Sequence, residues 1–142
     1  MLSTTPHELP SALLARAQKL PPVAMAIVGA DHPLALESAW QATKSGLIIP
    51  TLVGPKADIE RIAKDLGWSL DGASPEGPSA DAAAQLASAD EVQALMKGQI
   101  HTDTLMRAIV SRDAGLRTDR RISHVFHMTA PGTDKALMIT DG

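Results

Sequence analysis

The stretch Val23-Ala24-Met25-Ala26-Ile27-Val28 indicates the fold class, because it is apolar at every position. Such a run is typical of a strand covered on both faces, as in a parallel α/β sheet. It ends in Gly29-Ala30-Asp31, and a second apolar run, residues 47–53, ends in Gly54-Pro55. Pro50 interrupts the second run, so we expect Pro50 at the first residue of that strand or at a sheet edge.

The segments around these two runs have apolar residues at helical spacing. We predict helices over residues 8–20, from Pro33 to a stop at Gly46, over residues 56–66 with a stop at Gly67, and over residues 79–89. Residues 68–70 are predicted to form a short strand, and residues 71–79 a loop. This alternation predicts an α/β fold, a three-layer βαβ domain with a mostly parallel sheet.

The last third of the chain is different in character. Residues 122–128 and 135–141, joined by a turn at residues 130–134, predict a β-hairpin. His124 and His127 are three apart, so in a strand they point to opposite faces, and no metal site is predicted. We divide the chain into a tail and helix (residues 1–22) and an α/β part (residues 23–142). Because the sequence stops directly after a strand, we expect this domain to be incomplete at its C-terminus.

The segment from Lys97 to Arg107 carries most of the predicted chemistry. A short apolar strand precedes Lys97-Gly98, and a helix over residues 104–114 follows, capped by Thr102 or Asp103. A strand-turn-helix unit directs free backbone N–H groups and the positive end of a helix dipole at one spot, and anions bind there. The expected donors to that anion are Lys97, His101, Thr102, Thr104 and Arg107. In the alternative interpretation Lys97 is solvated, Thr102 is only a cap, and Arg107 lies on the outer face.

Three turns are expected on one rim of the sheet, where ligands of parallel sheets bind. They are residues 29–31, residues 54–56 and Lys97-Gly98. None of them has the spacing of a dinucleotide-binding fingerprint or a P-loop. Asp31 is interpreted as a turn or cap residue rather than a catalytic one, and His32 as a loop histidine.

Composition excludes several classes of function. The chain has 13 basic and 16 acidic residues, a net charge of −3, and no basic block, so we expect neither a nucleic-acid nor a membrane partner. It has no cysteine, no signal-like N-terminus and no apolar run long enough to span a bilayer. A cytoplasmic location is therefore expected.

Several motifs in order resemble one enzyme family. They are Val28-Gly29-Ala30-Asp31, Leu52-Val53-Gly54-Pro55, Leu95-Met96-Lys97-Gly98, His101-Thr102-Asp103-Thr104-Leu105-Met106-Arg107, Gly115-Leu116-Arg117, Arg121-Ile122-Ser123-His124-Val125-Phe126 and Leu137-Met138-Ile139-Thr140-Asp141-Gly142. Together they resemble the N-terminal half of the phosphate acetyltransferase and phosphate butyryltransferase family. The likeness is greater to the butyryltransferase-like branch, which includes the acyltransferase part of proteins fused to an enoyl-CoA hydratase-like domain.

The resemblance implies an enzyme that moves an acetyl or butyryl group between coenzyme A and inorganic phosphate. It also implies a fold similar to isocitrate and isopropylmalate dehydrogenases, with two α/β domains facing a cleft. By matching motif, the residues near the phosphate are Lys97, Gly98, His101, Thr102, Thr104, Arg107 and Ser123. In the acetyltransferase branch the spacing between that histidine and that arginine is one residue longer. The family's catalytic serine–arginine pair and aspartate lie in a second half that nothing here matches, so we expect the isolated chain to be inactive.

Two interpretations stay open. Either the chain is part of a phosphate acyltransferase with coenzyme A as co-substrate and no bound cofactor, or it is a non-catalytic anion- or coenzyme-A-binding fragment that needs a second chain or segment. In both cases the expected partners are acyl-CoA and phosphate, and we expect a homo-oligomer.

Overall fold

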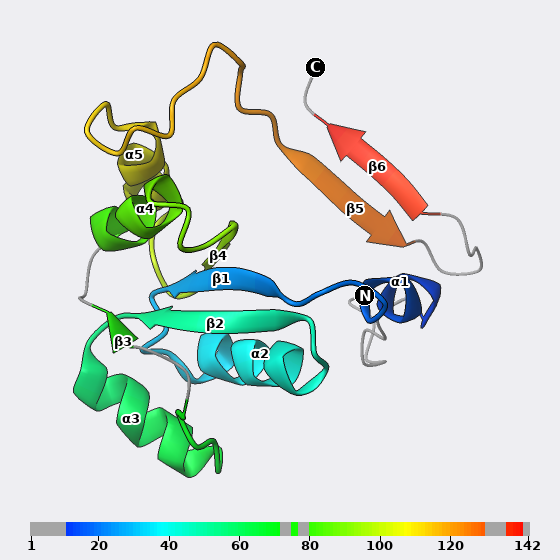
Figure 1. Ribbon diagram of the computed structural model, residues 1–142, viewed down its shortest axis with the longest axis vertical. Coiled ribbons are helices and arrows are strands. Elements are labelled where there is room, and N and C mark those ends of the chain that lie inside the picture. The colour runs from blue at the N-terminus through cyan, green and yellow to red at the C-terminus, as the bar shows by residue number, and fades with distance from the viewer. Residues whose placement is uncertain (1–10, 72–74, 77–79, 130–135, 141–142) are drawn as a thin grey trace, which may run out of the picture.

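The computed structural model describes residues 11–71, 75–76, 80–129 and 136–140 (Figure 1). Its elements in chain order are α1 (Ser11–Ala17), β1 (Val23–Val28), α2 (Pro33–Lys44), β2 (Ile48–Val53), α3 (Lys56–Asp65), β3 (Pro75–Glu76), α4 (Ala80–Ser88), β4 (Ala94–Lys97), α5 (Thr102–Val110), β5 (Val125–Thr129) and β6 (Ala136–Thr140). The start of the first predicted helix (residues 8–10), the predicted hairpin turn (residues 130–134) and the last two residues lie outside the described part. No described helix has the length and apolarity needed to cross a membrane.

The main sheet has the strand order β3-β2-β1-β4, and every described pairing in it is parallel. Strand β1 pairs with β2 from Val23 opposite Ile48 onward, and with β4 from Met25 opposite Ala94. The predicted α/β class with a mostly parallel sheet is therefore confirmed. Pro50 lies inside β2, not at its first residue, and pairs with Met25. Strand β3 pairs only with Leu52 and Val53, so Pro50 has no described strand on the side away from β1. Proline, which has no N–H, is tolerated at such an unpaired edge.

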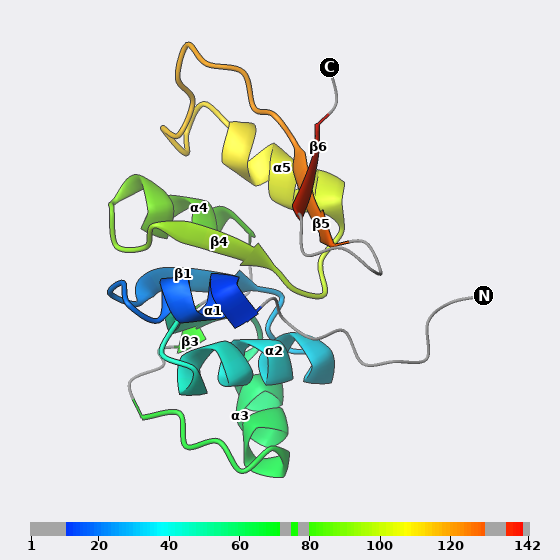
Figure 2. The same cartoon turned by 90° about the vertical axis from the view of Figure 1, so that its right-hand side faces the viewer.

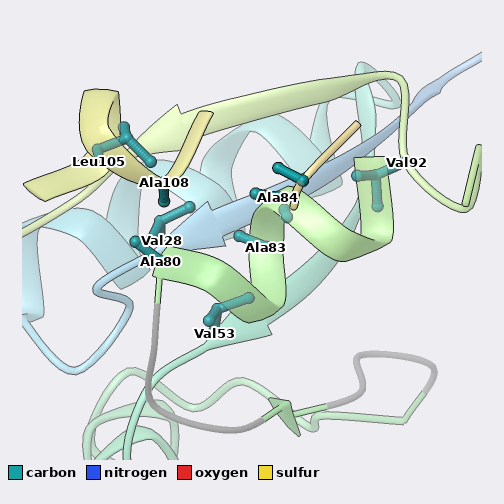
Figure 3. Packing of buried hydrophobic residues seen from close by; sticks show 10 residues of the cluster. Val28, Val53, Ala80, Ala83, Ala84, Val92, Leu105 and Ala108 are labelled. Atoms are coloured by element: carbon teal, nitrogen blue, oxygen red, sulfur yellow. The ribbon is translucent and has the colours of Figure 1, made fainter. Parts of the chain in front are cut away.

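Helices cover both faces of this sheet (Figures 1 and 2). Successive side chains of β1 point to opposite faces, so they pack against different helices. Ile27 belongs to one buried cluster, with residues of α2 and α3 such as Leu36 and Ile59. Ala26 and Val28 belong to a second cluster, with residues of α4 and α5. Figure 3 shows this second cluster, in which Ala80, Ala83 and Ala84 of α4 lie with Val28, Val53 and Ala108. The helices that carry the site are thus packed on the sheet by small side chains.

Two predicted elements are wrong. Residues 68–70 form no strand; Trp68 and Leu70 are instead partly buried against the α2–α3 cluster, so their apolar character serves helix packing. The third strand is β3, only two residues long, within the predicted loop. The last predicted helix is also shifted, since α5 begins at Thr102 and ends at Val110 rather than spanning residues 104–114.

The predicted hairpin is confirmed as the antiparallel pair β5–β6, a separate two-stranded sheet. In Figure 1 it lies beside the main sheet and is not part of it. Its apolar side chains are exposed on both faces of the hairpin, from about half to two-thirds of their surface (Val125, Phe126, Met128, Leu137, Met138, Ile139). Just before β5, His124 packs its ring against Phe126, with ring centroids 4.2 Å apart. An isolated two-stranded hairpin is marginally stable in water, so these faces are suited to further packing.

Candidate functional site

The carboxyl ends of β1, β2 and β4 meet at one edge of the sheet. The Gly29 N–H donates to the Val53 carbonyl (2.9 Å), the Gly98 N–H to the Val28 carbonyl (2.8 Å), and the Gln99 N–H to the Gly29 carbonyl (3.0 Å). The three predicted turns therefore lie on one rim. The chain moves from β1 outward to β2 and β3, then returns to β4 on the other side of β1. Such a reversal of strand order marks the usual ligand crevice of an open α/β sheet.

Gly29 and Gly98 interlock at this reversal. A Cβ added to Gly98 would lie 2.4 Å from the Gly29 carbonyl oxygen and 2.9 Å from that of Val28. A Cβ added to Gly29, whose φ is +77°, would lie 2.9 Å from the Gln99 carbonyl oxygen. Only glycine fits such backbone approach. Gly98 thus serves close contact with β1 and fixes where the following turn and α5 begin.

A small hollow of about 240 Å³ opens on this rim, lined among others by Gly29, Asp31, Gly54, Gln99 and Ile100. It is smaller than the roughly 300–1,000 Å³ of typical small-molecule sites. The Asp31 carboxylate faces Gly54 and repels an anion on that side. His32, not Asp31, is the N-cap of α2, where its Nδ1 accepts the Leu34 N–H (3.3 Å). The sequence did not single out Gln99, although its place directly after Gly98 was the available signal.

Helix α5 presents donors at its first turn. Its N-cap is His101, so the predicted cap at Thr102 or Asp103 is wrong, and the His101 side chain makes no capping hydrogen bond. The N–H groups of Thr104 and Leu105 donate to the His101 carbonyl (3.1 and 3.2 Å). Within the described part of the chain, no acceptor satisfies the N–H groups of Thr102 and Asp103. Two free donors therefore lie at the positive end of the α5 dipole.

Charged side chains flank this helix start. Lys97 is the last residue of β4, Thr102 and Thr104 lie in the first turn of α5, and their side chains are exposed. Arg107 is also exposed, and its guanidinium lies 3.7 Å from the Asp103 carboxylate one turn earlier. A surface pair of this kind contributes about 1 kcal/mol or less, so a bound dianion can displace it. Asp103 therefore places a negative charge beside this cation in the first turn of α5.

Ser123 belongs to a different segment from the other predicted site residues. It lies exposed in the segment between α5 and β5. Among the described residues, no hydrogen bond or ion pair joins Ser123 to the segment from Lys97 to Arg107. The structure brings Lys97, Gly98, His101, Thr102, Thr104 and Arg107 into one turn-helix unit, and it leaves Ser123 outside that unit.

Comparison with known proteins bears on both the fold and the family. The chain is 42% identical to a phosphate acetyltransferase of Rickettsia typhi over 137 residues, which cover 91% of this chain and 38% of the relative. It is 32% identical to a phosphate butyryltransferase of Clostridium beijerinckii, over 91% of this chain and 44% of the relative. The solved EutD phosphotransacetylase of Staphylococcus aureus superposes with a TM-score of 0.66 and 11% identity, over 93% of this chain and 50% of its own.

These matches confirm the predicted resemblance to the phosphate acetyltransferase and phosphate butyryltransferase family, and the structural superposition confirms the fold. They do not bear out the predicted greater likeness to the butyryltransferase-like branch, because the identity is 42% to the Rickettsia typhi acetyltransferase and 32% to the Clostridium beijerinckii butyryltransferase. The chain spans less than half the length of the two curated relatives. No family model matches the chain.

Proposed function

Because the chain is related to phosphate acetyltransferases and phosphate butyryltransferases over 91% of its length, we propose that it forms the phosphate-binding part of a phosphate acyltransferase. The reaction is acyl-CoA plus phosphate giving acyl phosphate plus coenzyme A, with an acetyl or butyryl group. The observation that carries the proposal is the start of α5 beside the reversal of strand order, where the N–H groups of Thr102 and Asp103 lack acceptors among the described residues.

The proposed role of this site is to bind and orient the phosphate dianion. The two free N–H groups and the hydroxyls of Thr102 and Thr104 donate to its oxygens, while Lys97 and Arg107 neutralise its charge. A phosphate oxygen then attacks the thioester carbonyl carbon, a carbon–oxygen bond forms, and the carbon–sulfur bond breaks. The thiolate leaves and takes up a proton. Positioning of this kind supplies effective concentration and preorganised charge, and no covalent protein nucleophile is needed.

The alternative, a non-catalytic fragment that needs a second chain or segment, is favoured by two features. The β5–β6 hairpin exposes apolar side chains on both faces, as a sheet does when it lacks its covering layers. In addition, none of the residues that the structure describes is a buried charged group of the kind that takes or gives protons in a closed site. In this alternative, the groups that handle the thiol proton come from the second chain or segment.

A chimera tests the proposal against this alternative. This chain replaces the matching 38% of the Rickettsia typhi relative, and release of coenzyme A from acetyl-CoA and butyryl-CoA is measured with and without phosphate. We expect phosphate-dependent release that Arg107→Ala weakens. The matched control is Arg61→Ala, which removes another exposed arginine with a one-turn aspartate partner, Asp58, on α3. A chimera that melts like the intact relative but releases no coenzyme A would contradict the proposed function.

A further inference from the structure

Ser123 has no role in the phosphate site proposed above, and its own surroundings indicate a different one. It follows Arg120-Arg121-Ile122, and Arg120-Arg121 is the only pair of adjacent basic residues in the chain. No other serine or threonine therefore has basic residues both two and three positions before it. The charge pattern in front of Ser123 is thus specific to this one hydroxyl.

The segment that carries Ser123 is open to solvent. Residues 117–128 are all exposed, and residues 121–124 form no helix or turn before they enter β5. Figure 1 shows the segment between α5 and β5 at the outside of the molecule, away from the main sheet.

The hydroxyls of this segment differ in their hydrogen bonding. The Ser111 hydroxyl accepts the Asp113 N–H, and the Thr118 hydroxyl accepts the Arg120 N–H, both at 3.2 Å. Within the described part of the chain, the Ser123 hydroxyl makes no hydrogen bond. Ser123 therefore offers an exposed hydroxyl that a modifying enzyme can reach without breaking an internal contact.

The two arginines in front of Ser123 are available to a partner protein. Both are exposed, and among the described residues neither takes part in an ion pair, although Asp119 directly precedes them. Guanidinium groups bind carboxylates in a two-point fork. Protein kinases select their substrates partly by such charge patterns. A substrate groove with carboxylates two and three positions before the acceptor hydroxyl matches this stretch.

We propose that Ser123 is a phosphorylation site for a serine/threonine kinase with an acidic substrate groove. The Ser123 Oγ attacks the γ-phosphorus of ATP, and a phosphorus–oxygen bond forms. The bond from that phosphorus to the β,γ-bridging oxygen breaks, so ADP leaves, and an aspartate of the kinase takes the hydroxyl proton. This inference does not depend on the proposed function.

The product places a phosphate beside cations of its own chain. Alternate residues of an extended segment point to the same side, so Arg121 is a neighbour of Ser123. Three arginines and one aspartate give residues 117–123 a net charge of +2. Phosphoserine carries a charge of about −1.5 to −2 at pH 7, so it pairs with the Arg121 guanidinium and cancels most of that positive charge.

The test treats the whole chain with Mg-ATP and a kinase of this specificity, the catalytic subunit of cyclic-AMP-dependent protein kinase, and locates phosphate by tandem mass spectrometry. We expect one phosphate per chain, on Ser123, and none in Ser123→Ala. Arg120→Gln and Arg121→Gln should each lower kcat/KM about tenfold or more, the effect of losing one charge-assisted hydrogen bond. The control Arg117→Gln alters an exposed arginine of the same segment outside the pair and should leave kcat/KM unchanged. A synthetic peptide of residues 117–127 is the standard for full access, and the whole chain should be phosphorylated at a comparable rate.

Four results would overturn the inference. They are absence of phosphate on the chain, phosphate on another residue, undiminished rates in the arginine-pair variants, and a whole chain modified far more slowly than the peptide, which would mean that the segment is covered. In the phosphorylated chain, the Arg121 guanidinium is expected to lower the pKa of the phosphoserine. A ³¹P NMR titration that gives the same pKa in phosphorylated Arg121→Gln would reject the contact with Arg121.

Discussion

Gly98→Ala perturbs the contact that fixes the start of the candidate site. The new Cβ would lie 2.4 Å from the Gly29 carbonyl oxygen and 3.1 Å from the Ala35 Cβ. The first distance is about 1 Å short of an ordinary contact of about 3.5 Å. Because the opposing atom is backbone, β4 and the following turn must move away from β1. That movement strains the Gly98-to-Val28 and Gln99-to-Gly29 hydrogen bonds.

The expected cost follows from these two effects. Overpacking costs about 1–3 kcal/mol, and weakening two backbone hydrogen bonds adds about 0.5–1.5 kcal/mol each, so the free energy of unfolding should fall by about 2–6 kcal/mol. Gly46→Ala is the matched control, since Gly46 has φ +70° and open space around its Cβ, which leaves only a backbone strain of about 1–2 kcal/mol. Urea unfolding followed by circular dichroism at fixed protein concentration measures both variants. A Gly98→Ala variant no less stable than Gly46→Ala would refute the interlocked-glycine account.

Three further predictions concern function and assembly. In the chimera, Arg107→Ala should raise the KM for phosphate about tenfold or more, since a charged hydrogen bond contributes about 1.5–3 kcal/mol. Arg107→Lys should raise the phosphate KM less, because the charge is kept. Asp103→Asn should lower the phosphate KM, because a competing carboxylate is removed from the helix start. An unchanged phosphate KM in Arg107→Ala would return Arg107 to the outer-face interpretation. The isolated chain should release coenzyme A at well below about 1 s⁻¹, and turnover at ordinary enzyme rates would contradict that. The exposed β5–β6 faces should make the chain self-associate, as measured by sedimentation velocity. Phe126→Ser should reduce this self-association, whereas the control Leu34→Ser, which alters an exposed leucine on α2, should leave it unchanged. A parent chain that stays monomeric over a wide concentration range would count against this prediction.

The sequence predicted those parts of the fold that local physics decides. The apolar run of β1 and the helix limits at Pro33, Gly46 and Gly67 were correct because they follow from burial periodicity, a favoured first-turn proline and left-handed glycines. Strand β3 was missed because its two residues, one of them proline, have no strand pattern and pair only with the end of β2. Its position is set by tertiary pairing.

The candidate site divides in the same way. The parallel topology predicted that the glycine-containing turns lie on one rim of the sheet. The position of Lys97 and Arg107 directly after a strand was the basis for predicting them as donors. The cap of α5 was misassigned because Thr102 and Asp103 are both good capping residues, whereas the chain places His101 there. The Arg107–Asp103 pair has the i,i+4 spacing of a helical ion pair, and it was missed because the predicted helix began at Thr104, which left Asp103 outside it.

Phosphate titration of the ¹⁵N-labelled chain, followed by amide NMR shifts, tests for a phosphate site at the start of α5. We expect inorganic phosphate to shift the amide signals of Thr102, Asp103 and Thr104 most, and we expect Arg107→Ala to reduce these shifts greatly. Sodium chloride at matched ionic strength serves as the control for screening. Two results would contradict a phosphate site at the start of α5. One is shifts confined to Arg117, Arg120 and Arg121. The other is no shift at phosphate concentrations up to tens of millimolar, since a Kd on the order of that concentration is too weak for specific binding.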